Sequence, residues 1–252
     1  MRRDPITSYG DGVAVVTVAS ASTPVDAVAE LAATARTATA GPVRIVVADS
    51  AGADRCTADI ELVRLGEHLG RGAAVNRAVA GLDRSVGWVA VADPGVRWSP
   101  GALDVLLAEG AAHPRAGALG PKLCDPAGRQ VFGGGAVPGL RDLLRRRPAT
   151  RLPAGTVGWL PATCLLLRRA ALDSVDGFDP RYPGAGDDID LGDRLGRTGW
   201  LNRHVPTAEV TVRRVDGPGM LETEGAALRR FVYDRSPAPT RALVALAVRG
   251  PR

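Results

Sequence analysis

The sequence is poor in the residues that build disulfide frameworks and histidine metal sites: its 252 residues include three cysteines and three histidines. Cys56, Cys124 and Cys164 are odd in number and too scattered along the chain for a zinc ligand set. We expect reduced thiols, as in a cytoplasmic protein, with Cys164 filling the core because it stands in an apolar run. A histidine-based metal site is not expected from so few histidines.

Long hydrophobic runs are missing as well. Residues Met1 to Gly12 are polar, unlike a signal peptide, and the apolar run Val13 to Ala19 is far too short to span a bilayer. Hydrophobic residues make up 45% of the chain, which is enough for a sizeable core. Because the chain shows neither an internal repeat nor a linker-like stretch, we expect one composite domain.

Lysine is almost absent: Lys122 is the only one among 32 basic residues, so the net charge of +5 is carried by arginine. This composition is typical of a GC-rich genome, and codon usage therefore accounts for part of the basicity. The remainder favours phosphate groups or an anionic membrane surface. The run Arg145–Arg147 is either a solvated face or a contact of that kind. Nucleic acid is not expected as a partner, because no recognised motif or aromatic stacking platform occurs.

Short apolar strands alternate with amphipathic helices through the first half of the chain. The expected strands are Gly12–Ala19, Val43–Ala48, Ile60–Leu65, Trp88–Ala92 and Ala116–Leu119. The same pattern returns later, with two further strands expected at Trp200–Val205 and Ala208–Val212. This alternation predicts the α/β class with a mostly parallel, doubly wound sheet.

Polar residues stand where three of these strands end. Asp49 follows the second strand, Gly70-Arg71-Gly72 opens the helix after the third, and Asp93 follows the fourth. Ligands of doubly wound sheets bind outside the carboxyl ends of the strands, so this arrangement favours a nucleotide-type cleft. Ordinary phosphate loops are excluded, because Val75 stands where the dinucleotide motif needs glycine and no P-loop sequence occurs.

An acidic stretch, Asp187 to Asp193, follows a Gly-rich turn and opens a predicted helix. Asp190 and Arg194, like Asp193 and Arg197, are spaced for ion pairs one helical turn apart. Two interpretations are about equally supported by these residues alone. The carboxylates either complement the helix dipole or place a general base at the mouth of a cleft.

The order of these motifs resembles the GT-A family 2 glycosyltransferases, and within them the actinobacterial rhamnosyltransferases that extend a lipid-diphospho-N-acetylglucosamine acceptor. The resemblance runs from about Val13 to Asp216. Its motifs are weak singly but specific as an ordered set: Val47–Ser50, His68–Arg77, Ala92–Val96, Gly117–Lys122, Val157–Leu160, Cys164–Arg169, Gly177–Asp179, Asp187–Leu195 and Gly199–Leu201.

This resemblance implies a GT-A fold, with a nucleotide-sugar half at about 12–120, an acceptor and catalytic half at about 121–235, and a tail at 236–252. Family roles can be carried over to eight residues. Asp49 is expected to contact the nucleotide base, and Gly70, Gly72 and Asn76 are expected to lie beneath the nucleotide. Asp93 falls in the metal motif. The pair Asp187-Asp188 matches the family's catalytic acids, with Asp188 as the base and Asp190 as a supporting acid.

The sequence departs from the family pattern at two positions where the family binds a divalent metal ion. Gly95 replaces the aspartate that coordinates the divalent ion, and Val212-Arg213-Arg214 stands where the family places a metal-side histidine. We therefore expect dependence on Mg²⁺ or Mn²⁺ to be weak or absent. Arg213, Arg214 and Arg71 are candidates for the positive charge that a diphosphate leaving group needs.

The resemblance implies an inverting transfer of a sugar, rhamnose among the candidates, from a dTDP- or UDP-sugar to a glycan or lipid-diphospho-sugar acceptor in cell-envelope polysaccharide synthesis. A cytoplasmic location at the inner face of the membrane would fit. The alternative is a pseudoenzyme with this fold that serves as a binding or partner subunit. The paired metal-site departures favour that alternative, and the retained Asp187, Asp188 and Asp190 oppose it.

Overall fold

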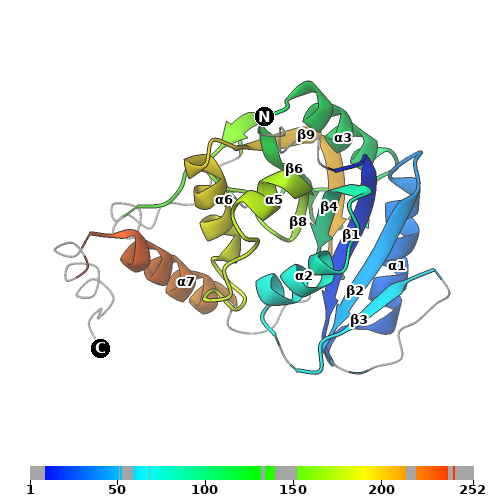
Figure 1. Cartoon of the computed structure of the whole chain (residues 1–252), viewed down its shortest axis with the longest axis horizontal. Coiled ribbons are helices and arrows are strands. Elements are labelled where there is room, and N and C mark those ends of the chain that lie inside the picture. The colour runs from blue at the N-terminus through cyan, green and yellow to red at the C-terminus, as the bar shows by residue number, and fades with distance from the viewer. Residues whose placement is uncertain are drawn as a thin grey trace.

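The computed structural model describes residues 9–50, 52, 59–67, 69–131, 134–139, 152–213, 220–237 and 241, with backbone alone for 220–227. Its centre is one sheet with the strand order β3-β2-β1-β4-β8-β6-β9-β5, and β7 pairs with β9 (Figure 1). Cys56, His68, Arg145–Arg147 and Arg214, all named above, lie outside the described residues.

The first four strands of this order are parallel, as the sequence pattern predicts. They are β3 (Glu61–Arg64), β2 (Val43–Asp49), β1 (Gly12–Ala19) and β4 (Val86–Ala92). β1 and β4 lie inside the sheet, and both are rich in valine and alanine. Such near-continuous apolar runs are typical of strands covered on both faces. The second half is mixed, because β8 (Cys164–Arg168) runs antiparallel to both β4 and β6.

Helices cover both faces of the sheet, and alternate residues of each strand serve the two layers. Val13 and Val15 of β1 pack with α1 (Val25–Thr37) and α3 (Ala102–Ala112). Ala14 and Val16 point the other way, toward α2 (Arg71–Ala80), α5 (Arg169–Ser174) and α6 (Asp187–Arg197). This alternation follows from the two-residue period of a strand. Cys164 is fully buried in the first of these layers, so its expected place in the core is confirmed.

The two strands expected near the end of the chain form one strand, β9 (Leu201–Val212). Its neighbour β6 (Ala116–Cys124) pairs Pro121 with Val205 and then Lys122 with Glu209. The residues between them therefore form a bulge, in which Pro206 and Thr207 are exposed. A break between two strands was predicted here because proline has no N–H to donate to a neighbouring strand. A bulge accommodates the proline without ending the strand.

Three further elements complete the structure. The short strands β5 (Val96–Trp98) and β7 (Gly155–Val157) both pair with β9. Helix α7 (Met220–Arg235) lies beside α6, at the end of the molecule away from β1 to β3 (Figure 1). In the part of the chain that the structure describes, no helix is both long and apolar enough to cross a membrane.

Candidate active site

The acidic stretch forms the first turn of α6, which begins at Asp187 after Gly186. Gly186 has a φ of 82°, a left-handed conformation that glycine adopts without strain. Asp187 and Asp190 are buried, whereas Asp188 is half-buried. The three carboxylates lie at the positive end of the helix dipole, and Arg194 and Arg197 lie at its negative end.

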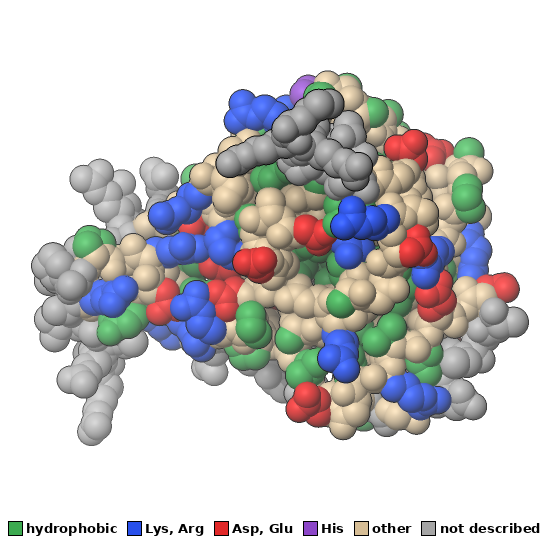
Figure 2. Space-filling view, in the orientation of Figure 1, with side chains coloured by type: hydrophobic (Ala, Val, Ile, Leu, Met, Phe, Trp, Pro, Cys, Tyr) green, Lys and Arg blue, Asp and Glu red, His purple; other side chains and the backbone are tan. Residues whose placement is uncertain are grey.

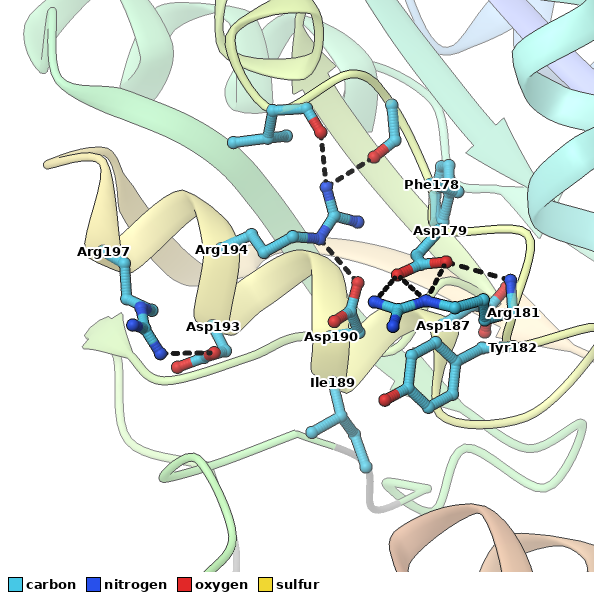
Figure 3. A network of polar contacts seen from close by, with 12 residues as sticks. Phe178, Asp179, Arg181, Tyr182, Asp187, Ile189, Asp190, Asp193, Arg194 and Arg197 are labelled. Atoms are coloured by element: carbon cyan, nitrogen blue, oxygen red, sulfur yellow. Dashed lines mark hydrogen bonds and ion pairs between the residues drawn. The ribbon is translucent and has the colours of Figure 1, made fainter. Parts of the chain in front are cut away.

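Both ion pairs predicted within α6 are confirmed. Arg194 Nε lies 2.6 Å from Asp190 Oδ2, and Arg197 Nη1 lies 3.9 Å from Asp193 Oδ2 (Figure 3). Arg194 also donates to the carbonyl oxygens of Val175 and Gly177, at 2.6 and 2.8 Å. Asp190 thus holds the arginine that fastens the preceding loop to α6.

Arg71, at the start of α2, joins two of the predicted site residues. Its Nε and Nη2 donate to the two carboxylate oxygens of Asp187, at 3.1 and 2.6 Å. Its Nη1 lies 3.8 Å from Asp93 Oδ1, at the end of β4. The Asp187 side chain is fully buried, and one-fifth of the Arg71 side chain is exposed. The structure therefore brings Arg71, Asp93 and Asp187 together around one guanidinium.

Asp188 is the carboxylate of this group that is best suited to accept a proton. Its Oδ1 accepts from the backbone N–H of Ile189 at 2.9 Å, and its Oδ2 from that of Ala162 at 3.4 Å. Burial raises the pKa of Asp188 to about 6; Arg71 opposes this rise and the charge of Asp187 adds to it. A base with such a pKa is stronger than an ordinary carboxylate and is still ionised at neutral pH.

Asp93 is open to ligands on one side. Although 41% of its side chain is exposed, the surrounding protein removes enough water from the carboxyl to raise its pKa. Arg71 opposes this rise, and the charge of Asp187 adds to it. The backbone N–H of Asp93 donates to the carbonyl oxygen of Thr163 at 2.9 Å, which fixes the end of β4 beside β8.

The start of α2 is packed against the loop that leads to α6. A side chain at position 70 would come within 2.5 Å of Pro183, and one at position 72 within 2.7 Å of Phe178. Asn76 accepts from the N–H of Phe178 at 2.9 Å and donates to its carbonyl oxygen at 2.7 Å. Gly70 and Gly72 are thus required for close approach of the protein's own backbone, a reason that the sequence does not reveal. The predicted place of all three beneath a nucleotide stays a prediction.

The remaining predicted residues lie at the ends of other strands. Asp49 is buried at the end of β2, and its carbonyl oxygen accepts from the N–H of Leu65 at 2.9 Å. Arg213 follows β9; its side chain is 58% exposed, and its Nη1 lies 3.9 Å from Glu30 Oε2. Contacts of Asp49 and Arg213 with a nucleotide-sugar stay predictions.

Among the described residues, the divalent-metal motif of the family is incomplete, since Gly95 has no side chain to act as a ligand beside Asp93. A side chain at position 95 would clash with the carbonyl oxygen of Arg213, and the Arg213 N–H donates to the Gly95 carbonyl oxygen at 2.9 Å. The backbone just after β9 thus occupies the space that a side chain at this position of the family motif would need. Among the described residues, no three His, Cys, Asp or Glu side chains are grouped to hold a metal ion. We derive no chemical step through a metal.

The contacts between α7 and the start of α6 were not predicted from the sequence. Arg235 of α7 places its Nη2 2.9 Å from Asp190 Oδ1 and 3.1 Å from Asp193 Oδ2. Tyr182 donates from its hydroxyl to Asp234 Oδ2 at 2.9 Å, which adds a second link between α7 and the loop before α6. These partners lie 45 and 52 residues apart, so no local spacing marks them.

Comparison with known proteins shows a relative that is named as a rhamnosyltransferase. Over 215 residues, 72% of this chain and 70% of the relative, the chain is 40% identical to N-acetylglucosaminyl-diphospho-decaprenol L-rhamnosyltransferase of Mycobacterium tuberculosis, in two strains. A shorter similarity, 36% over 113 residues, covers 40% of this chain and 9% of the O-antigen biosynthesis protein RfbC of Myxococcus xanthus. No protein-family model matches the chain.

Solved structures of similar fold are glycosyltransferases. A mannosyltransferase from Pyrobaculum calidifontis, solved with GDP-Man and Mn²⁺, matches with a TM-score of 0.57 at 18% identity, over 97% of this chain and 81% of that one. GalNAc-T7, solved with UDP, GalNAc and Mn²⁺, matches with a TM-score of 0.60 at 14% identity, over 88% of this chain and 48% of that one. At these identities the similarity concerns the fold.

Proposed function

The chain belongs to the GT-A glycosyltransferases, in the family of the mycobacterial rhamnosyltransferases, and we propose that it transfers a sugar from a nucleotide-diphospho-sugar to a hydroxyl group of a lipid-linked glycan. The family membership and the GT-A fold predicted from the sequence motifs are confirmed by these relatives. The proposed setting is cell-envelope polysaccharide synthesis, with rhamnose as the leading candidate sugar.

The proposed reaction inverts the anomeric centre. Asp188 removes the proton of the acceptor hydroxyl while that oxygen attacks the anomeric carbon. The bond from this carbon to the diphosphate oxygen breaks, and the electron pair leaves with the nucleoside diphosphate. A positioned base of this kind contributes about 10²–10⁴ in rate.

The observation that carries the proposal is the position of Asp188 next to the Arg71 cluster. Asp188 is the second residue of α6 and directly follows Asp187, whose carboxylate is held by Arg71. Asp93 lies near the remaining nitrogen of that guanidinium. A donor bound along the ends of β2 and β4 would present its diphosphate to this cluster. The raised pKa of Asp188 supports its assignment as the base.

Arginine is proposed to stabilise the leaving diphosphate. Two of the three nitrogens of the Arg71 guanidinium are bonded to Asp187, and Nη1 makes a long contact with Asp93, so Nη1 can still donate to a phosphate oxygen. Arg213 is largely exposed and could turn toward the same diphosphate. Arg214, which lies outside the described residues, is the third candidate.

A screen of nucleotide-sugar hydrolysis and transfer tests this function. The purified protein is incubated with dTDP-, UDP- and GDP-sugars, with and without a lipid-diphospho-N-acetylglucosamine acceptor, and released nucleotide is measured. Acceptor-stimulated release from one donor supports the proposal. The absence of turnover and of calorimetric binding for every donor, with and without Mn²⁺, would instead support the pseudoenzyme, which the closed position at Gly95 favours.

A further inference from the structure

Helix α7 has two faces of different character. Leu228, Phe231 and Val232 pack on the protein, where they join Tyr182 and Ile189 in a small apolar cluster. Arg229, Arg230 and Tyr233 are exposed. Tyr233 follows Arg229 by four residues and Arg230 by three, and both spacings place side chains on the same side of a helix, so these three form a single outward face.

This outward face is basic and carries one aromatic ring. The Arg241 guanidinium lies 5.8 Å from the centroid of the Tyr233 ring, which adds a third exposed arginine to the same surface. Tyr233 is 42% exposed, and among the described large hydrophobic side chains only Val25 is more exposed. Figure 2 shows basic side chains recurring along the arm of the molecule where α7 lies, with acidic ones among them.

Asp234 is the acidic residue among the described side chains of α7, and its carboxylate is engaged by its neighbours. Asp234 accepts from the Tyr182 hydroxyl at 2.9 Å, and its Oδ2 lies 3.9 Å from Arg230 Nε. Arg235 turns inward to Asp190 and Asp193. The outward face, which we define as Arg229, Arg230, Tyr233 and Arg241, therefore presents positive charge to its surroundings.

From this face we infer that α7 docks the protein on the anionic headgroups of a phospholipid bilayer. Each basic residue near an anionic bilayer surface contributes about 1 kcal/mol, and tyrosine is favoured at the level of the headgroups. With one aromatic ring on this face, the attachment is electrostatic and shallow.

The same helix is fixed to the candidate active site. Arg235 binds Asp190 in the first turn of α6, two residues after Asp188. Docking through the outward face would hold the start of α6 at the bilayer surface, where a lipid-linked hydroxyl arrives. The role of docking in acceptor delivery rests on the proposed function, whereas the binding of α7 to anionic lipid does not.

Sedimentation with lipid vesicles tests the inference without donor or acceptor. The full chain is mixed with phosphatidylcholine vesicles that contain or lack phosphatidylglycerol, and the bound fraction is measured. We expect binding to the anionic vesicles alone. Release is expected at about 1 M salt, where the Debye length is about 3 Å.

Two variants locate the contact. Arg229→Gln should weaken binding about fivefold, and Arg229→Gln combined with Arg230→Gln should weaken it about 25-fold, since each arginine contributes about 1 kcal/mol. The matched control is Arg36→Gln with Arg77→Gln, which removes the same charge from exposed positions on α1 and α2. Equal binding to neutral vesicles, no vesicle binding, or an equal loss in the control pair would overturn the inference. Sugar transfer to a soluble acceptor is measured separately, so a failure of the proposed function is distinguishable.

Discussion

Arg71 and Asp187 form a two-point ion pair, with Nη2 to Oδ1 at 2.6 Å and Nε to Oδ2 at 3.1 Å, although they stand 116 positions apart in the chain. The pair joins the start of α2 to the start of α6 and leaves the Asp187 side chain without solvent contact. Removal of one partner would leave the other charge buried without compensation.

This pair predicts strong coupling between the two positions. Arg71→Met should lower the free energy of unfolding by about 3–5 kcal/mol, because the buried Asp187 carboxylate loses its partner. Asp187→Leu should have a similar effect. The double variant should lose much less than the sum, as measured by urea denaturation of all four proteins. Strictly additive losses would show that the two side chains do not interact in solution.

The pH dependence of sugar transfer should report Asp188. Its pKa is raised to about 6, and the ionised form is the base, so activity should reach a plateau above that pH. Below it, kcat/KM should fall about tenfold per pH unit as the carboxylate takes up a proton. The value of kcat/KM is measured from pH 5 to 8 with acceptor below its KM, and circular dichroism confirms that the protein stays folded. A value that stays level down to pH 5, as an unperturbed aspartate with a pKa of about 4 would give, would contradict this assignment.

Gly95 should not tolerate the aspartate that the family carries at this position. A Cβ atom at position 95 would overlap the carbonyl oxygen of Arg213 in the backbone. Gly95→Asp should therefore reduce stability by about 1–3 kcal/mol, as overpacking does, without creating metal dependence. Gly95→Ala is the matched control and should lose a similar amount, because the clash begins at Cβ. Thermal unfolding compares the two; a stable Gly95→Asp variant whose activity rises with Mn²⁺ would show that the site reopens.

Chelation should have little effect on the wild-type reaction. The described residues offer no trio of metal-ligating side chains, and arginines are proposed to balance the diphosphate charge. Transfer rates are compared in EDTA and in added Mg²⁺ or Mn²⁺. Loss of activity in EDTA with recovery on addition of metal would show that Asp93 acts with further ligands after all.

Contacts within one element were predictable from the sequence, and contacts between elements were not. Asp190 and Arg194 were recognised as a pair because their spacing of four residues is fixed by the helix itself. Arg71 was singled out beside glycines, but its partner Asp187 becomes visible only when α2 and α6 are folded onto the same face of the sheet.

The same limit applies to other contacts between elements. The Gly-rich start of α2 was predicted to lie beneath a nucleotide, which stays a prediction, and the sequence did not reveal that the same glycines allow close approach to Pro183 and Phe178. The sequence does not identify the partner in a close approach. Likewise, Pro206 indicated a strand end, and the bulge that absorbs it depends on the pairing of β6 with β9. The acidic residues at the start of α6 were recognisable, but their burial was not.

The most direct test of the proposed mechanism is the effect of Asp188→Asn on transfer and on donor binding, measured on the same preparation. The pKa of Asp188 is about 6 in the folded protein and about 4 in the unfolded chain, so folding stability falls as the pH rises between these values. At pH 7 the ionised wild-type carboxylate carries this full cost. The amide removes that penalty, so the variant should be at least as stable as the wild type. Asp193→Asn, one turn later on α6, serves as the control. We predict that Asp188→Asn lowers the transfer rate by about 10²–10⁴ while calorimetry shows nearly unchanged donor affinity. Wild-type activity in this variant would remove Asp188 from the mechanism.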